Sequence, residues 1–110
     1  MPYNEELEEM TDALSISYGH LGKKKMFGGI CYLTGGNMCF GIYKDFLIVR
    51  IGDMKKTEKL LSEEGCRPFD ITGRPMKGWL MVNKAVLPDL EVLRTWTDQG
   101  LSFAKTLPEK

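Results

Sequence analysis

The chain has 110 residues, with fifteen Lys and Arg side chains against fifteen Asp and Glu, and hydrophobic residues make up 43% of it. This size and apolar content predict a single domain, residues 1–110, with one two-layer core. The zero formal charge argues against a dedicated nucleic-acid binder. The sequence lacks a signal peptide, and no apolar run approaches the ~18 residues of a membrane span. We therefore predict a cytoplasmic protein without membrane association.

Charge is distributed unevenly along the chain. Residues 1–12 carry five acids and no base, residues 13–60 carry eight bases against three acids, and residues 61–110 carry seven of each. Because the basic excess is confined to the middle segment, we expect at most weak, salt-dependent and sequence-indifferent binding to DNA. The lysine run 23–25 is interpreted as a solvated loop, with an acidic protein or a phosphate backbone as the alternative.

A helix begins the predicted order of elements. Asn4 is a suitable N-cap, and Leu7, Met10 and Leu14 follow it at helical spacing. We expect this helix to end near residues 15–17.

Three strands are predicted next because three runs are rich in aromatic and β-branched side chains. These runs are residues 26–33, 38–43 and 46–51. The connections at 34–37 and 44–45 are short, so the strands should form an antiparallel meander. Gly28 and Gly29, inside the first run, are expected to form a bulge or to allow a close backbone approach.

The three cysteines, Cys31, Cys39 and Cys66, lack any C-x-x-C pair and predict reduced, mostly buried thiols. A two-residue turn in the first hairpin would pair Cys31 with Phe40 and place Cys31 and Cys39 on opposite faces of the sheet, whereas another loop length would bring them together. With His20 as the single histidine, we expect no metal site.

A short helix and two further strands are predicted after the meander. Asp53 can cap a helix that carries Met54, Leu60 and Leu61 inward, and Gly65 is a natural C-terminal stop. Strands are then expected over two ranges on either side of a Gly- and Pro-containing loop at 73–77. These ranges are residues 67–72 and 78–83.

The last predicted helix runs from residue 88 or 89 to about 106. Its apolar stripe consists of Leu90, Leu93, Trp96, Gly100, Leu101 and Ala104. Glycine in a helix costs about 1 kcal/mol relative to alanine, so we expect a close contact between Gly100 and the first helix. The predicted order α-β-β-β-α-β-β-α corresponds to an α+β fold with a mainly antiparallel five-stranded sheet packed against helices.

Four ordered motifs combine Gly and Pro with large apolar and cationic side chains. They are Met-Phe-Gly-Gly at 26–29, Gly-Asn-Met at 36–38, Arg-Pro-Phe at 67–69 and Gly-Arg-Pro-Met-x-x-Trp at 73–79. Their order and spacing resemble the N-terminal domain of the TfoX/Sxy family over essentially the whole chain. The resemblance implies an α+β architecture, no catalytic residues and, for the competence regulators, action as a transcriptional coactivator with the cyclic-AMP receptor protein. The full regulators continue into a second, helical domain, so the resemblance is to a stand-alone N-terminal domain.

The main functional hypothesis is a non-enzymatic protein-interaction module, because no serine, cysteine or carboxylate lies beside a partnering base in a recognised motif. By resemblance, the partner would be the cyclic-AMP receptor protein or another transcription factor, and no cofactor is expected. The candidate partner-binding residues are Arg67, Arg74, Met76, Lys77 and Trp79. The structural alternative is that Arg67 or Arg74 pairs with Asp70 and fixes the loop.

The second functional hypothesis is a small-ligand or nucleotide-binding domain, with or without enzymatic activity. It would use the basic middle segment and a pocket between the sheet and the helices. The candidate ligand or anion contacts are Lys25 and Arg50, and such a site should be concave and contain one of them or Arg74.

Overall fold

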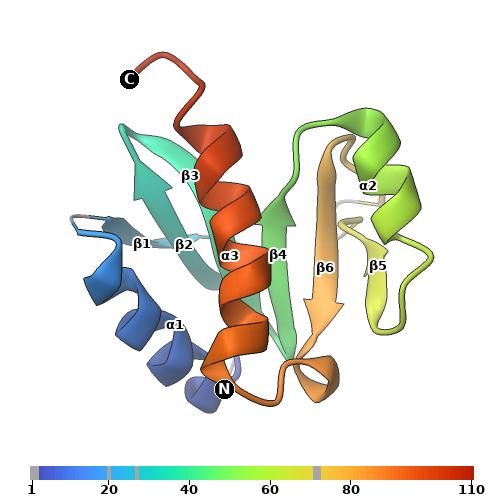
Figure 1. Cartoon of the computed structure of the whole chain (residues 1–110), viewed down its shortest axis with the longest axis horizontal. Coiled ribbons are helices and arrows are strands. Elements are labelled where there is room, and N and C mark those ends of the chain that lie inside the picture. The colour runs from blue at the N-terminus through green and yellow to red at the C-terminus, as the bar shows by residue number, and fades with distance from the viewer. Residues whose placement is uncertain (1–2, 20, 27, 71–72) are drawn as a thin grey trace.

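The computed structural model describes residues 3–19, 21–26, 28–70 and 73–110. Within them, three α-helices lie on one face of a six-stranded antiparallel sheet, which confirms the α+β class (Figure 1). The elements are α1 Glu5–Ser17, β1 Gly22–Met26, β2 Gly29–Thr34, β3 Asn37–Tyr43, β4 Phe46–Arg50, α2 Met54–Leu60, β5 Cys66–Pro68, β6 Trp79–Asn83, a short 3-10 helix Lys84–Val86, and α3 Leu90–Ala104. The sheet order is β1-β2-β3-β4-β6-β5.

The sheet has one more strand than the sequence predicted. The expected strand 26–33 is instead the β1–β2 hairpin, in which Met26 pairs with Gly29. Gly28 sits in the turn with φ +78°, a left-handed conformation that glycine adopts without strain. The lysine run 23–25 therefore lies in an exposed edge strand rather than in a loop.

The later strands are shorter than predicted, because Pro and Gly residues bound them. β5 ends at Pro68, which has no N–H to continue the ladder. β6 begins at Trp79 because Gly78 is left-handed, with φ +83°. The predictions for Ile71 and Thr72, and those involving His20 and Phe27, fall outside the described residues.

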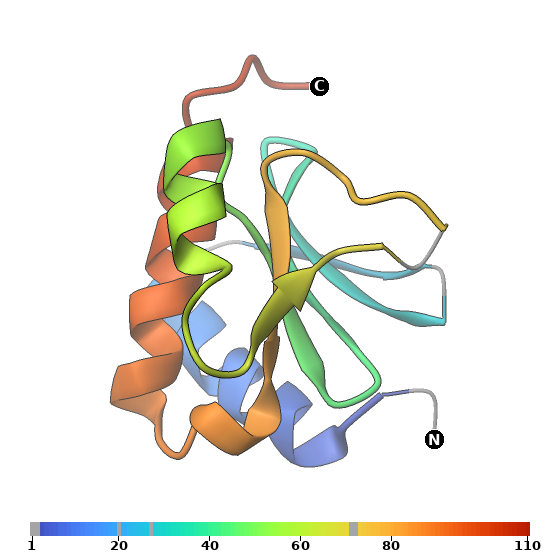
Figure 2. The same ribbon diagram turned by 90° about the vertical axis from the view of Figure 1, so that its right-hand side faces the viewer.

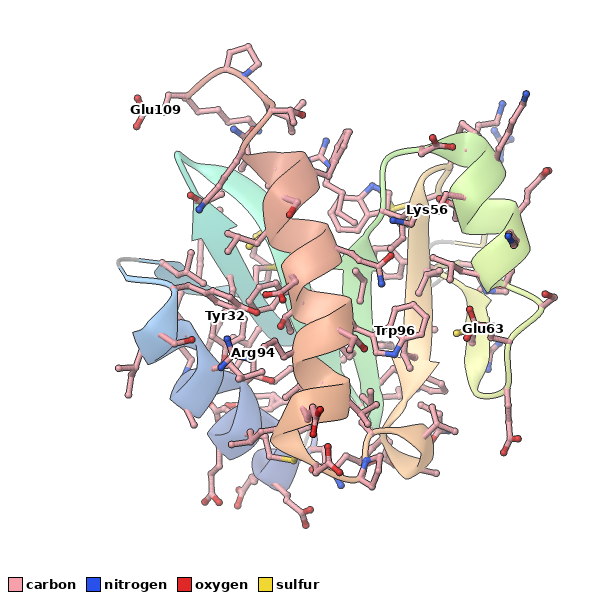
Figure 3. All side chains as sticks on the ribbon, in the orientation of Figure 1. Tyr32, Lys56, Glu63, Arg94, Trp96 and Glu109 are labelled. Atoms are coloured by element: carbon pink, nitrogen blue, oxygen red, sulfur yellow. The ribbon has the colours of Figure 1, made fainter. Side chains whose placement is uncertain are left out.

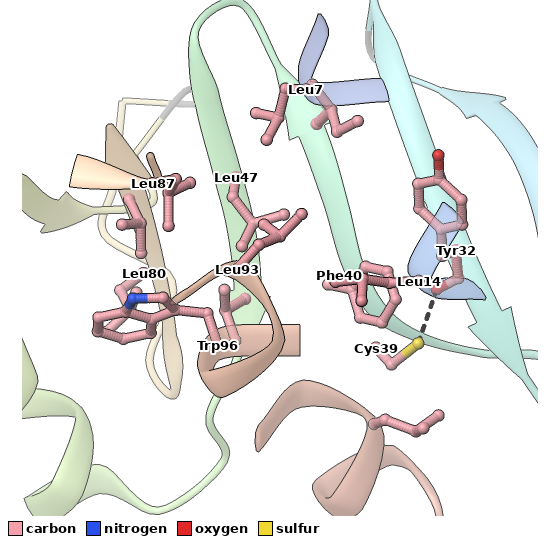
Figure 4. Close-up of a cluster of buried hydrophobic side chains, with 14 of the residues drawn as sticks. Leu7, Leu14, Tyr32, Cys39, Phe40, Leu47, Leu80, Leu87, Leu93 and Trp96 are labelled. Atoms are coloured by element: carbon pink, nitrogen blue, oxygen red, sulfur yellow. Dashed lines mark hydrogen bonds between the residues drawn. The ribbon is translucent and has the colours of Figure 1, made fainter. Parts of the chain in front are cut away.

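The main core lies between the sheet and the helices. It includes Leu7 and Leu14 of α1, Leu93 and Trp96 of α3, and strand residues such as Tyr32, Phe40, Leu47, Leu80 and Val82 (Figure 4). Phe40 and Tyr32 stack with ring centroids 5.2 Å apart. The Cys39 thiol donates a hydrogen bond to the Tyr32 carbonyl oxygen at 3.2 Å, drawn as a dashed line in Figure 4.

Gly100 is buried, as predicted, but it contacts a strand rather than the first helix. A Cβ at this position would meet the carbonyl group of Cys39 in β3 and, at 3.4 Å, the side chain of Val49 in β4. The absence of a side chain therefore lets α3 approach the backbone of the sheet closely.

The first residues of two helices are more exposed than their apolar stripes predicted. Met54 begins α2 and is 47% exposed, and Leu90 begins α3 and is 43% exposed. Both directly follow their capping residues, so they lie at helix ends rather than over the core. Leu60 and Leu61 pack against the core as expected.

The β2–β3 register differs from the predicted one. The pairs are Leu33–Met38, Tyr32–Phe40 and Cys31–Gly41, with an irregularity between Tyr32 and Leu33. The predicted pairing of Cys31 with Phe40 is wrong because this bulge shifts the register by one residue. Cys39 belongs to the main core, whereas Cys31 alternates with Ile30 and Tyr32, so the two thiols lie on opposite faces of the sheet.

The face of the sheet opposite the helices carries a second, smaller cluster. Ile48, Phe69 and Met81 are buried there, and partly buried Met38, Tyr43, Phe46 and Trp79 pack around them. Figure 2 shows that the described residues between β5 and β6, 69–70 and 73–78, project on this side of the sheet. Phe69 of the Arg-Pro-Phe motif is thus the buried residue through which this segment covers the face opposite the helices.

The Gly-Asn-Met motif holds the C-terminal segment. Asn37 is buried and donates a side-chain hydrogen bond to the Pro108 carbonyl oxygen at 2.9 Å, and the Lys110 amide donates to the Gly35 carbonyl oxygen at 2.8 Å. Glu109 accordingly lies by the β2–β3 turn, where its Cγ would be 2.8 Å from a Cβ on Gly35 (Figure 3). The motif therefore has a structural role.

Candidate interaction surface

The 73–79 loop, which contains most of the candidate partner-binding residues, has a firmly held backbone. The Gly78 carbonyl oxygen accepts hydrogen bonds from the amides of Ile51 at 2.8 Å and Gly52 at 2.9 Å. The Met76 amide donates to the Phe69 carbonyl oxygen at 3.0 Å. A Cβ on Gly78 would lie 3.2 Å from the Gly52 carbonyl oxygen, so this close backbone contact also favours glycine.

The side chains of this loop point to solvent. Arg74, Met76 and Lys77 are exposed, Met76 by 41%. Among the described residues, the Arg74 and Lys77 side chains form no hydrogen bond or ion pair. Trp79 is partly buried, because alternation along β6 directs it toward the second cluster, where its ring lies 5.8 Å from that of Phe69.

Two arginines lie over aromatic rings beside the loop. The Arg50 guanidinium is 5.1 Å from the Trp79 ring and 5.4 Å from the Phe103 ring. The Arg67 guanidinium is 5.7 Å from the Phe46 ring. Such stacking leaves the N–H groups at the edge of a guanidinium able to bind a carboxylate.

The structural alternative for the loop, an ion pair to Asp70, is not found among the described residues. Arg67 stacks on Phe46 instead, and the Asp70 carbonyl oxygen accepts a hydrogen bond from the Gly73 amide at 2.9 Å. Backbone bonds rather than a salt bridge therefore hold the start of the loop.

A small apolar groove lies between α2 and the loop, and we call it the α2 groove. Its volume is about 230 Å³, and it is lined by Met54, Thr57, Glu58, Leu61, Pro68, Pro75, Met76, Lys77, Gly78 and Trp79. Three α2 residues and the C-cap Leu61 recur at helical spacing, so one face of the helix forms one wall. The loop and the end of β5 form the other wall.

Charge follows secondary structure in this chain. The charged residues in the six strands are all basic: Lys23, Lys24, Lys25, Arg50 and Arg67. By contrast, α1 alone carries five acids, namely Glu5, Glu6, Glu8, Glu9 and Asp12. The strands thus carry five of the fifteen Lys and Arg residues and no acid, whereas α1 carries acids and no base.

The two ligand candidates, Lys25 and Arg50, do not share a site. Lys25 is in edge strand β1 and Arg50 in β4, three strand spacings or roughly 14 Å away across the sheet. The register places Lys25 level with Leu47, so Arg50 is also displaced along β4. Lys25 lines a hollow of about 330 Å³ with Tyr3, Glu8, Lys23, Lys24 and Ile30. Lys23 in this hollow is already paired with Glu8 at 2.8 Å and with Asp12 at 3.0 Å.

The three cysteines are free thiols, and Cys31 and Cys39 are buried. Burial raises the pKa of all three, that of Cys39 to about 12 and, with help from Glu63, that of Cys66 to about 11. The thiols are therefore protonated and weakly nucleophilic near neutral pH. Among the described residues, no three His, Cys, Asp or Glu side chains form a group that could hold a metal ion.

Sequence reasoning missed two features of this surface. Met54 was expected in the core but lines the α2 groove. Its position directly after the cap Asp53 could have indicated that it lies at the exposed start of the helix. No pattern in the sequence indicates that Arg50 stacks on Trp79 and Phe103, because the three residues belong to β4, β6 and α3 and are distant in the chain.

None of the described helices is long and apolar enough to span a bilayer.

Fold and surface together define a small α+β domain in which a cationic and aromatic loop lies beside an apolar groove that α2 walls on the other side. The chain belongs to the TfoX N-terminal domain family, whose model matches residues 12–104. This match confirms the resemblance indicated by the four motifs. No significant match was found among curated proteins or among solved structures.

Proposed function

We propose that this domain is a non-enzymatic protein-interaction module that binds its partner through the 73–79 loop. The observation that supports this proposal is the contrast between the fixed backbone of the loop and its exposed side chains, whose cations have no hydrogen bond or ion pair among the described residues. Arg74, Met76 and Lys77 extend from a backbone held by the Gly78 and Met76 hydrogen bonds. Exposed cations and apolar side chains on a rigid loop are suited to recognition rather than to stabilising the fold.

Membership of the TfoX N-terminal domain family supports a role in regulation. The competence regulators of this family act as transcriptional coactivators, so the proposed partner is the cyclic-AMP receptor protein or another transcription factor in the cytoplasm. We do not propose strong direct binding to nucleic acid, because the formal charge of the chain is zero.

The test compares partner capture with thermal stability. The purified chain is immobilised, and retention of the cyclic-AMP receptor protein is measured for the wild type, Arg74→Ala and Lys77→Ala. Arg94→Ala is the matched control, because Arg94 is exposed on α3, within the helix layer (Figure 3). We expect both loop variants to lose most of the captured protein while their melting temperatures stay near that of the wild type.

Two outcomes would contradict the proposal. If both loop variants melt several degrees earlier and the folded fraction still captures its partner, the loop is structural. If the wild-type chain captures neither this receptor nor another transcription factor, the interaction role itself fails.

A second candidate function, binding of a small anion or nucleotide, is favoured by the three lysines of the β1 hollow. Lys24 and Lys25 form no ion pair within the described residues, so they are available to a phosphate. Titration with a nucleoside triphosphate should then shift the β1 amide resonances, and Lys25→Ala should abolish the shifts. Unchanged spectra would eliminate this candidate.

A further inference from the structure

We infer that the α2 groove accepts one apolar side chain from an acidic peptide segment of the partner, an inference that rests on the proposed function and names the chemistry of its ligand. Three independent observations lead to it: the size and lining of the groove, the fixed geometry of its walls, and the charge around it.

The groove is apolar and small. Its volume of about 230 Å³ is below the roughly 300–1,000 Å³ of typical small-molecule sites, so it suits one inserted side chain. Met54 and Met76, 47% and 41% exposed, both line it. Two exposed methionines at one groove differ from single surface apolar residues, and their flexible thioethers can pack around varied apolar groups.

The walls of the groove are already in place. Asp53 caps α2 by accepting a hydrogen bond from the Lys56 amide at 3.0 Å, and the Thr57 hydroxyl donates to the Asp53 carbonyl oxygen at 2.6 Å. On the loop side, the Gly78 carbonyl oxygen accepts hydrogen bonds from the amides of Ile51 and Gly52, which lead into α2. One hydrogen-bonded unit therefore joins both walls, so binding needs little further ordering.

The charge beside the groove favours an acidic ligand. Lys77 lines it, Arg74 lies in the same loop, and Arg50 stacks on Trp79, another lining residue. Glu58 is the carboxylate among the described lining residues. Counted over both walls, residues 53–61 carry three lysines against two acids, and the described residues of 68–79 carry two cations against one acid. With Arg50 added, the net charge around the apolar centre is positive, which complements a peptide with Asp or Glu on either side of an apolar residue.

The same surface is less suited to a single-stranded nucleic acid. Binding of bases requires free aromatic faces for stacking. Trp79 and Phe46, however, each have an arginine over the ring. One Arg50 N–H group donates to the Met38 carbonyl oxygen at 3.4 Å. The other N–H groups of Arg50 and those of Arg67 remain for carboxylates, so an acidic peptide is the better match.

The test starts with a displayed library of random twelve-residue peptides, selected on the immobilised full chain. Affinities of the enriched peptides are then measured by fluorescence polarisation. The apolar contribution is tested with the double variant Met54→Ala/Met76→Ala, for which Ile16→Ala, at a residue 81% exposed on α1, is the control. The charge contribution is tested with Lys77→Glu, for which Arg94→Glu on α3 is the control.

We expect enriched peptides to carry an apolar residue between acidic ones. Both groove variants should bind them about tenfold more weakly, while both controls stay within about twofold of the wild type. Selection of no peptides, selection of peptides without acids, or unchanged affinity of the groove variants would overturn the inference.

Capture of the cyclic-AMP receptor protein separates this inference from the proposed function. If the double methionine variant captures the receptor as well as the wild type does, the groove is not used and the proposed function stands. If the wild-type chain captures no transcription factor, the proposed function fails, whereas the peptide measurements still decide whether the groove binds acidic peptides.

Discussion

The two faces of the sheet are covered in different ways. Three helices cover one face, where Phe40, Leu47 and Leu80 are fully buried. On the other face, a loop with one buried aromatic, Phe69, leaves Phe46 and Trp79 partly exposed beneath arginines. The difference teaches that the helix side provides the stability of the domain, so the loop side can present side chains that do not stabilise it.

The largest expected effect contrasts one phenylalanine from each face. Phe40→Ala should lower the free energy of unfolding by about 3–5 kcal/mol, because it removes a fully buried ring. Phe46→Ala removes a partly buried ring and should cost about 1–2 kcal/mol. Urea unfolding followed by tryptophan fluorescence measures both values, and equal losses would break the comparison.

Gly100→Ala should be the next most harmful change. Alanine normally stabilises a helix by about 1 kcal/mol relative to glycine, but here the new Cβ would collide with the Cys39 carbonyl group. We expect a net loss of about 1–3 kcal/mol from overpacking. Ser102→Ala, at an exposed position of the same helix, is the control and should change stability little. A stabilised Gly100→Ala protein would show that α3 can move away from the sheet.

Alkaline unfolding should be partly controlled by Tyr18 on the helix side. Burial, followed by the hydrogen bond to Asp98, raises the pKa of Tyr18 from 10.0 to about 12. The folded state therefore holds this proton more tightly than the unfolded state, and the resulting stability is complete below pH 10 and is lost between pH 10 and about 12. Tyr18→Phe should flatten the decline of stability over this window; the same slope in both proteins would contradict the assignment.

The smallest effect is expected for the cations of the loop side. Arg67→Ala removes an exposed stacking contact with Phe46 and should cost no more than about 1 kcal/mol. Thermal unfolding beside the Arg94→Ala control measures this value. A loss of several kcal/mol would mean that the arginines of the open face hold the fold, and the contrast between the two faces would disappear.

Much of the helix side could be predicted from the sequence. The caps Asn4, Asp53 and Asp89 each accept the backbone hydrogen bond that their residue types indicate. Leu93 and Trp96 face the core at the predicted helical spacing. These features are local, because a cap or an amphipathic stripe depends on residues within a few positions of each other.

The local signals failed where the chain changes direction. Gly28 was expected to form a bulge or a close approach within one strand, but its positive φ forms a turn that adds a sixth strand. Glycine permits either conformation, so the residue alone does not distinguish them. The one-residue shift that pairs Cys31 with Gly41 likewise depends on a bulge set by the packing of two strands.

By itself, the sequence determined the α+β class, the family and the residues of the exposed loop, because composition, periodicity and four motifs carry that information within short segments. Only the tertiary structure decided that Met54 and Met76 flank one groove and that Arg50 stacks on Trp79. These residues lie more than twenty positions apart in the chain. Their contacts arise because the Gly78 carbonyl oxygen accepts hydrogen bonds from Ile51 and Gly52, which joins the loop to the start of α2.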